Sequence, residues 1–534
     1  MPGWTPDADL GASFAWTFAG HSLGGWSRRL VEAPSLAMPW PETPDGRRAL
    51  PWSDSLVARS EVLGAWLGPD AALMTASSSH LPTRDVRARS VFRIDNGDFG
   101  ISRYSLVFER GDSLRWLRYQ TSSGARSGAG PYGPSGDHVW DLTTSFTRGA
   151  HTLRANISQR GAAQELSQSV IYEDAGAQSG RLEYEWSGGD RHLSAAFARG
   201  LDRREDLVSS QGEPVSYSRR DAQENRFEIG ADAAALGGTV AVRGMAARSR
   251  VLRTFDDSFE ARTTTLWGAL SYVRPIPPGT LRLELGGGHS SALDRGLVAP
   301  SAALEFGAPA AHGRVFAQRL VNPVWSDLAL GQPAFLQSTT AFGIEAEGSG
   351  RSLSGRASVL TGTTRDRAIV FPYPIQDIWL RAGATADPQR YDFGLFMVSA
   401  RAEAAFAGMG AEAFALARDQ AADEPRPEPD QGGRGWIEGR HAFFKRDLGV
   451  RLRLEAAEVG ARDSKTGGIE TRLPSYWTGS ASVILRLSDV TGIFSWQNLE
   501  NVRHPESWID PQTGDLALGP GRQFRLSFTW RLMN

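Results

Sequence analysis

Apolar and polar residues alternate along most of the chain, an arrangement that places one set of side chains on each face of a β-strand. The same period recurs in several segments, among them Leu281–Leu285 and Leu448–Leu454. The alternation is unbroken near the C-terminus. The apolar positions there are Phe524, Leu526, Phe528, Trp530 and Leu532, and the residues between them are Arg, Ser, Thr and Arg. The pattern predicts an all-β protein whose last strand runs from Phe524 to Leu532.

The length and charge of the alternating segments indicate strands that cross a membrane. They run for about ten residues, the length a strand tilted near 45° needs to span a bilayer, whereas soluble strands usually have about five or six. Arginine and glutamate lie within them, as Arg282 and Glu284 do; such residues are costly in a soluble core but favourable beside a watery lumen. We therefore expect a transmembrane barrel, apolar outside and polar inside. A large soluble all-β protein is the alternative, and no repeat of propeller-blade length supports it.

Connections of two lengths alternate, as they do in membrane barrels that have short periplasmic turns and long external loops. Short turns are expected near 111–112, 148–149, 188–190, 275–279, 348–350, 388–389, 445–446 and 488–489, and long connections at 121–137, 161–178, 201–223, 321–336, 362–375, 460–474 and 499–521. Counting from a first strand at Val86–Asp95 gives an antiparallel up-and-down barrel of about 22 strands, an even number. This count treats Tyr391–Asp419 as one long strand, bulged at Gly408–Gly410; if that segment is a hairpin, the parity fails.

Composition excludes several classes of protein. The formal net charge is -2, and the chain lacks the clustered cations that binding to nucleic acid requires. Hydrophobic residues make up 41% of the chain, and no run of about 20 apolar residues is present that could form a spanning helix. With no cysteine, disulfides and thiolate metal sites are excluded. The first residues, Met1–Pro6, do not resemble a signal peptide, so we expect that a signal has been removed or that the true start lies upstream.

Candidate chemistry is sparse. The nine histidines are scattered and show no metal-ligand spacing. Ser290, His289 and Asp294 have the residue types of a hydrolase, but no motif joins a nucleophile to a base, and Gly286–Gly288 before them is interpreted as the start of a flexible loop. We expect no enzymatic activity, no metal site and no cofactor; an outer-membrane hydrolase is the third hypothesis, after the two given below.

Charged residues of the strands are expected to form networks inside the barrel. In a plugged barrel these would hold the plug, and in an open one they would favour anions. The residues expected in the networks are the arginines Arg282, Arg356, Arg451 and Arg453 and the glutamates Glu284, Glu345 and Glu455.

Three stretches resemble the TonB-dependent receptor family of outer-membrane transporters. The C-terminal stretch, Asn498–Asn501 with Pro520–Leu532, is similar to the closing hairpin of the family, and Arg319–Leu328 with Gly343–Glu347 is similar to a recurring barrel segment. Ser60–Gly64 with Gly68–Leu73 resembles the end of the plug domain, and the residues that carry this likeness are Glu61, Val62, Leu63, Gly68 and Pro69. The resemblance divides the chain into a partial plug-like region, residues 1–85, and a barrel, residues 86–534.

The resemblance implies a receptor in the outer membrane of a diderm bacterium that binds an external nutrient and admits it to the periplasm. Its partners would be outer-membrane lipid, TonB or another periplasmic envelope protein, and an unidentified small molecule. Residues 1–85 are fewer than a complete plug with a TonB-binding segment requires, and no such segment is visible. The second hypothesis is therefore a plugless porin or a structural barrel of an envelope complex. The substrate is not identifiable, because no recognisable motif lies in the loops.

Overall fold

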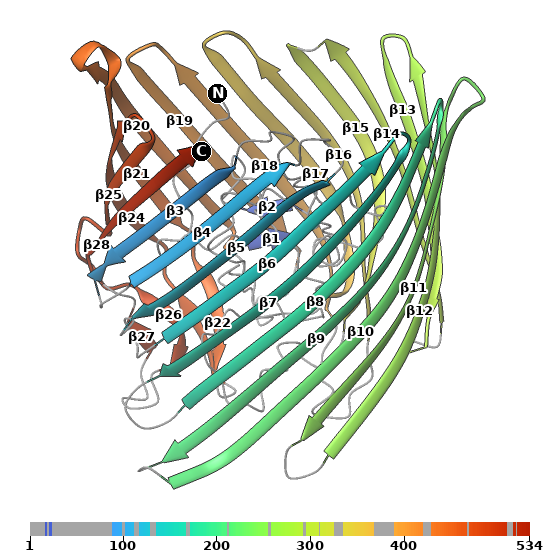
Figure 1. Cartoon of the computed structure of the whole chain (residues 1–534), viewed down its shortest axis with the longest axis horizontal. Helices are drawn as coiled ribbons and strands as arrows, with labels where there is room; N and C mark the ends of the chain where they lie inside the picture. Colours follow the sequence, from blue (N-terminus) through green and yellow to red (C-terminus); the bar gives the residue numbers. More distant parts are fainter. Residues whose placement is uncertain are drawn as a thin grey trace.

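In the computed structural model, 22 strands of the described chain pair into one closed antiparallel barrel (Figure 1). The structure describes residues 16–18, 21–23 and then 88–533 with gaps, the longest of which covers 368–388. The predicted fold class and strand number are thus confirmed. Among the described residues, no helix is both long and apolar enough to cross a membrane.

The strands that form the barrel follow one another along the chain, each paired with the next. They are β3 (Arg89–Gly97), β4 (Ser102–Gly111), β5 (Leu117–Gly128), β6 (Ser135–Arg148), β7 (His151–Leu166), β8 (Ile171–Gly188), β9 (Arg191–Ser210), β10 (Glu213–Ala235), β11 (Gly238–Thr254), β12 (Ser258–Ile276), β13 (Gly279–Ser290), β14 (Arg295–Ala308), β15 (Ala311–Val324), β16 (Phe335–Ser349), β17 (Leu353–Arg367), β18 (Gln389–Glu403), β19 (Ala407–Arg418), β20 (Gln431–Phe443), β21 (Leu448–Val459), β24 (Tyr476–Leu487), β25 (Val490–Gln497) and β28 (Gln523–Met533).

The remaining elements are short and lie outside the barrel sheet. Two-stranded sheets are formed by β1 (Trp16–Phe18) with β2 (His21–Leu23), by β22 (Arg462–Thr466) with β23 (Ile469–Leu473), and by β26 (Pro505–Ile509) with β27 (Leu516–Leu518). A 3-10 turn, η4 (Phe444–Arg446), connects β20 to β21. The second and third of these sheets therefore lie in the connections that precede β24 and β28.

Pairing of the last barrel strand with the first closes the sheet. Phe528 of β28 lies opposite Ile94 of β3, and Trp530 lies opposite Phe92. On its other side β28 pairs with β25, where Phe528 lies opposite Gly492. Because both edges of β28 are paired, the barrel has no free edge at this seam.

Connections longer than five residues all lie at one end of the barrel, as the loop pattern predicts, although between β7 and β14 the connections at that end have only two to four residues. Predicted short turns at Arg148-Gly149 and Gly188–Asp190 are confirmed, and each leaves two residues between its strands. Gly189 has a φ of 59°, a conformation that favours glycine and suits the tight turns of hairpins. We call this the short-turn end and the opposite one the long-loop end.

The interpretation of Tyr391–Asp419 as one strand is wrong. This segment is a hairpin in which β18 and β19 are joined by a turn at residues 404–406, closed by a 2.8 Å hydrogen bond from the Ala404 amide to the Ala407 carbonyl. The short turn expected at Pro388-Gln389 is also wrong, because Gln389 already begins β18. The two errors cancel: one short turn moves to residues 404–406, and the even strand count survives.

Strands β8 to β12 are far longer than the ten residues predicted, and we call this part of the barrel the long-strand wall. They contain 17 to 23 residues, and Figure 1 shows β9 and β10 extending past their neighbours. Most of the predicted long connections at 161–178 and 201–223 is therefore strand, and most of the one predicted at 121–137 likewise belongs to β5 and β6. At about 3.4 Å per residue, β10 is roughly 75 Å long, more than a tilted strand needs to cross a hydrocarbon layer of about 30 Å.

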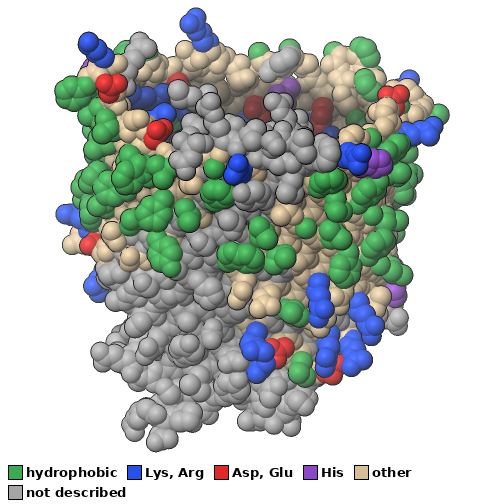
Figure 2. Space-filling model, viewed as in Figure 1, with side chains coloured by type: hydrophobic (Ala, Val, Ile, Leu, Met, Phe, Trp, Pro, Cys, Tyr) green, Lys and Arg blue, Asp and Glu red, His purple; other side chains and the backbone are tan. Residues whose placement is uncertain are grey.

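Outward-facing side chains along β10 change character at one position. From Phe227 to Ala235 every second residue is apolar and faces outward, whereas Asn225, Gln223 and Asp221 continue the same face with polar groups. The apolar stretch has nine residues, which matches a membrane-crossing strand of about 9–11 residues. Figure 2 shows apolar side chains over much of the barrel, with arginines gathered below them at the lower right.

Outward residues of the apolar band are expected to tolerate charge poorly. Ile344 on β16 is 58% exposed although it is apolar, so Ile344→Arg would place a guanidinium in lipid and lower the free energy of unfolding by about 2–4 kcal/mol. Denaturant unfolding in lipid vesicles would measure the change. Leu236→Arg, in the turn after β10, is the matched control and should cost at most about 1 kcal/mol; equal costs for the two variants would contradict the assigned band.

Candidate functional site

The inner wall of the barrel carries the most organised set of charged side chains, and we take it as the candidate site. On β8, Arg181 and Glu183 face the lumen, and on β10 Arg226 and Glu228 do the same. Arg181 donates a 2.8 Å hydrogen bond to Glu228 across the intervening strand, and Arg226 lies 3.4 Å from the same carboxylate. On the other side, Arg154 of β7 lies 2.8 Å from Glu185. The charges on β7, β8 and β10 are therefore paired with opposite charges across this part of the inner wall.

Small residues on β9 allow the contact between β8 and β10. Ala198 lies between Arg181 and Arg226 in the register, and Ala196 lies between Glu183 and Glu228. Both alanines are buried, at 1% and 6% exposure, so the longer side chains pass over them. This pair is absent from the sequence-based prediction; two alanines at alternate positions between charged strands are the signal that could have indicated it.

A second charged network covers the inner wall from β14 to β17. Glu345 on β16 lies 3.6 Å from Arg356 on β17 and 3.8 Å from Arg314 on β15. Arg314 also lies 3.9 Å from Glu305 on β14. Arg356 and Glu345 thus belong to a charged network on the inner wall, as predicted.

The same kind of network continues over β18 to β21 around an aromatic ring. The guanidinium of Arg453 lies 4.5 Å from the centre of the Trp436 ring, and that of Arg401 lies 5.6 Å away, both within cation–π range. Arg453 also lies 2.8 Å from Glu455, so both belong to a charged network on the inner wall, as predicted. Arg451 lies 3.2 Å from Glu438, a partner that the sequence-based prediction did not include.

An apolar patch interrupts the charged inner wall. It spans β14 to β21, and its members are buried although they face the lumen. Leu360 on β17 has 0% exposure, and Leu395 and Met397 on β18 have 1% each. The complete patch is Ala303, Phe316, Ala341, Leu360, Tyr391, Phe393, Leu395, Met397, Phe414, Leu416 and Val459.

Ion pairs at the long-loop end connect the β22–β23 hairpin to the barrel. Arg472 of β23 lies 2.8 Å from Asp463 of β22 and 3.4 Å from Asp430, which also pairs with Arg418 of β19. Partial burial opposes the charge of Arg472, but the hydrogen bonds to Asp463 and Asp430 outweigh it and raise the pKa of the guanidinium. Tyr476 and His504 stack nearby with ring centres 3.9 Å apart.

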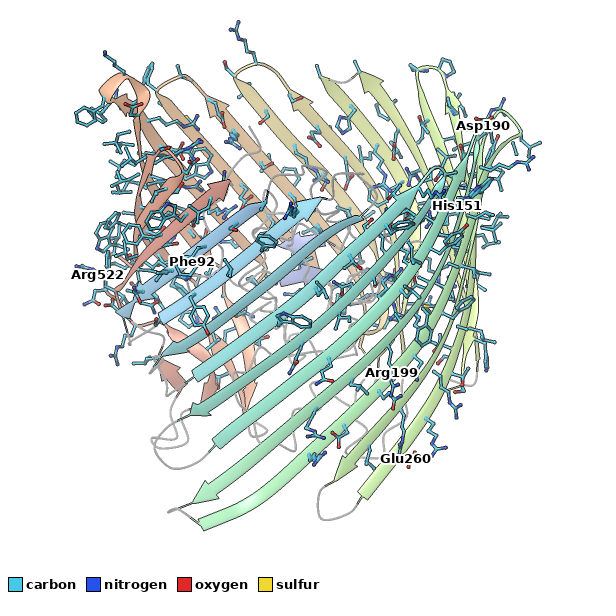
Figure 3. All side chains as sticks on the ribbon, viewed as in Figure 1. Phe92, His151, Asp190, Arg199, Glu260 and Arg522 are labelled. Carbon is cyan, nitrogen blue, oxygen red and sulfur yellow. The ribbon has the colours of Figure 1, made fainter. Side chains whose placement is uncertain are left out.

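The outer face of the long-strand wall carries a separate set of charges. Asp221 lies 2.8 Å from Arg219 and 3.0 Å from Arg203. Glu260 lies 2.6 Å from Arg262 and 2.9 Å from Arg250. Hydrogen bonds from Arg262 and Arg250 lower the pKa of Glu260; desolvation would raise the pKa of Asp221, but its two arginines outweigh this effect and lower it. Figure 3 shows Arg199 and Glu260 on this part of the wall, with Asp190 at the opposite end.

The residues of the predicted C-terminal strand lie together in β28. Phe528, Trp530 and Leu532 are 42%, 53% and 47% exposed on the outer face, whereas Arg525 and Ser527, which precede them, are buried on the inner face. Phe524 and Leu526 lie on the same face of the strand as Phe528. The ring of Phe524 lies 5.4 Å from that of Trp496 on β25. The residues of the predicted plug-like motif, Glu61, Val62, Leu63, Gly68 and Pro69, lie outside the described residues.

The candidate hydrolase residues do not assemble. Ser290 is fully buried on the inner face, whereas the adjacent His289 is exposed on the outer face, because successive residues of a strand point to opposite sides; Asp294 lies outside the described residues. Gly286–Gly288 do not begin a loop but belong to β13, where the absence of a Cβ at Gly286 and Gly288 leaves room for the Trp267 ring of β12. Within the described chain, no group of three potential metal ligands lies close together.

The barrel is similar to those of several outer-membrane transport proteins of known structure. The copper transporter OprC matches with a TM-score of 0.68 at 12% identity over 85% of this chain and 81% of the other. The ferripyoverdine receptor of the Pseudomonas aeruginosa outer membrane matches at 0.68 and 10% over 85% and 72%. The FrpB iron transporter of Neisseria meningitidis, in its apoprotein form, matches at 0.66 and 10% over 84% and 82%. The fold is therefore that of TonB-dependent receptor barrels.

Sequence comparison adds nothing to this structural likeness. No protein-family model and no curated protein matches the chain. With identities of 9–12% to the similar structures, the likeness concerns the barrel and leaves the ligand unspecified.

The pair between Arg181 and Glu228 is expected to stabilise the inner wall only as a pair. Arg181→Met removes a cation that compensates the largely buried Glu228 carboxylate, so the free energy of unfolding should fall by about 3 kcal/mol. Adding Glu228→Met removes the carboxylate that has lost this partner and should restore part of the loss, although it also removes an ion-pair partner of the buried Arg226. Denaturant unfolding of the two single variants and the double variant would measure the coupling.

The matched control for this cycle is Arg262→Met, whose arginine is exposed on the outer face and should contribute less than about 1 kcal/mol. A double variant that loses as much as the two single variants together would show that the residues act independently, contrary to the prediction.

Proposed function

We propose that the chain is an outer-membrane transporter that binds a nutrient at its long-loop end and admits it to the periplasm. The observation that carries the proposal is a closed barrel of 22 strands with an apolar outer band and a charged inner wall. Barrels of this size have a plugged lumen, in contrast to porins of about 16–18 strands. The short-turn end would lie in the periplasm and the long-loop end outside the cell.

Residues 1–85 would form a reduced plug within the lumen. Burial of the inner apolar patch supports an occupied lumen, because Leu360, Leu395 and Met397 would be wetted in an open aqueous channel. The paired charges on β7, β8 and β10 provide a second surface to which polar groups of a plug could bind. Release of such a plug would require work, which TonB or a similar envelope protein would supply.

The nutrient would be a scarce compound too large or too dilute for passive diffusion. The names of the similar proteins include a copper transporter, an iron transporter and a ferripyoverdine receptor, so a chelated transition metal is the first class to test. Tyr476, His504 and the ion pairs around Asp430 lie at the long-loop end, where an arriving ligand would first make contact.

An occupied lumen predicts little ion flow. The purified full-length chain, reconstituted in planar lipid bilayers, should show negligible steady conductance, because a plug would fill the pore. A barrel of the same chain lacking residues 1–85 is the matched comparison and should conduct strongly. Large steady conductance of the intact chain would overturn the plugged transporter and favour the passive pore.

Energy-dependent uptake is the functional prediction. Cells that carry the gene should grow better than a deletion strain when a chelated metal at low concentration is the limiting nutrient, and removal of TonB should abolish the difference. A panel of iron and copper chelates, with growth rate as the measurement, would identify the substrate class. An advantage that persists without TonB would contradict coupling to that protein.

A further inference from the structure

The outer face of the long-strand wall changes from apolar to cationic within one row of cross-strand neighbours. In one row, Phe197 of β9 lies opposite Phe227 of β10, and Leu266 of β12 continues the row. In the next row towards the long-loop end, Arg199 lies opposite Asn225, which lies opposite Arg248 of β11. The side chains of both rows point outward. Two guanidiniums thus border the apolar band directly.

Arg199 and Arg248 differ from the other arginines of this face. Asp221 is shared by Arg203 and Arg219, and Glu260 is shared by Arg250 and Arg262. For Arg199 and Arg248 the described side chains supply no carboxylate within ion-pair distance. Both are exposed on the outer face, and the two carboxylates nearby are already compensated, so positive charge is in excess here.

The spacing of the two arginines suits a single anionic group. They lie on the strands on either side of β10, so their backbones are about 10 Å apart, given roughly 4.8 Å between neighbouring strands. Their long side chains can lean towards each other over Asn225, whose amide adds a donor. Guanidinium groups bind phosphate in a bidentate manner, with charge-assisted hydrogen bonds.

The adjacent apolar row indicates that the ligand also has a hydrocarbon part. A ligand held here would have its anionic group against Arg199 and Arg248 and its hydrocarbon against Phe197 and Phe227, which are each 49% exposed. Hydrocarbon joined to a phosphorylated head group is the chemistry of a membrane lipid at its polar boundary. In the orientation of the proposed function, this boundary belongs to the outer leaflet.

We propose that the outer face of β9 to β11 is a binding site for a phosphorylated glycolipid of the outer leaflet, in which Arg199, Asn225 and Arg248 bind a phosphate and Phe197 and Phe227 contact an acyl chain. This inference goes beyond transport and depends on the proposed function only for the membrane placement of the barrel.

Lipid binding to the full-length protein in detergent tests the proposal. Native mass spectrometry would compare bisphosphorylated lipid A with the same lipid after removal of its phosphates. The wild-type chain should bind the phosphorylated form more tightly, and Arg199→Gln with Arg248→Gln should weaken that binding by at least about tenfold, because two charge-assisted contacts are lost. Lysine at both positions should weaken it less, since charge remains while bidentate geometry does not.

The matched control is Arg191→Gln with Arg274→Gln, at exposed arginines of β9 and β12 near the short-turn end. This variant should bind the lipid as the wild type does, and the shift in electrophoretic migration on heating should show that every variant is folded. Equal binding by the Arg199/Arg248 variant and the wild type would overturn the proposal, as would equal loss in the control. Displacement of the lipid by millimolar inorganic phosphate would indicate a free-anion site instead and would also overturn it.

The same variants separate this inference from the proposed function. The Arg199/Arg248 variant should keep the conductance of the wild type, because both residues face away from the lumen. A barrel that conducts strongly but still binds the lipid would overturn the plugged transporter while leaving the lipid site in place.

Discussion

Satisfaction of every backbone hydrogen bond is the constraint on which the rest of this structure depends. A strand in a hydrocarbon layer has no water to bind its free N–H and C=O groups, so only a sheet without edges is stable there. In this chain the pairing of β28 with β3 joins the two edges of the sheet, although the two strands lie more than four hundred residues apart in sequence. The apolar outer surface and the charged inner surface both depend on this closed sheet.

Once the wall is closed, the period of two in the side chains creates two different surfaces from one set of strands. The outer surface is apolar where lipid lies, and on β10 it becomes polar at Asn225. The inner surface can hold charge because neighbouring strands supply the opposite sign, as Arg181 and Glu228 do. Trp436 and Arg453 show a second way to hold a cation on this surface.

Much of the fold was predictable from the sequence, because alternation and loop length are local properties. The turn at residues 404–406 was missed because Ala404, Ala405 and Phe406 include none of the usual turn residues. The parts of β9 and β10 towards the long-loop end were assigned to connections because their few apolar residues do not alternate regularly with polar ones. The pair of Arg181 and Glu228 was missed because register between strands is set by tertiary pairing, which sequence spacing does not reveal.

Because the strands of the long-strand wall are so long, their correct register depends on the short turns that join them. Gly189 and Asp190 fix the register of β8 against β9, and that register is carried through some twenty residues of each strand. The halves of these strands towards the long-loop end have few apolar residues and so resist slippage only weakly. A single residue inserted in this turn would exchange the inner and outer faces of one strand along its whole length, putting Phe197 in the lumen and Ala198 towards lipid. We therefore expect each hairpin to form from its turn outwards, so that the two strands are in register before their far ends pair.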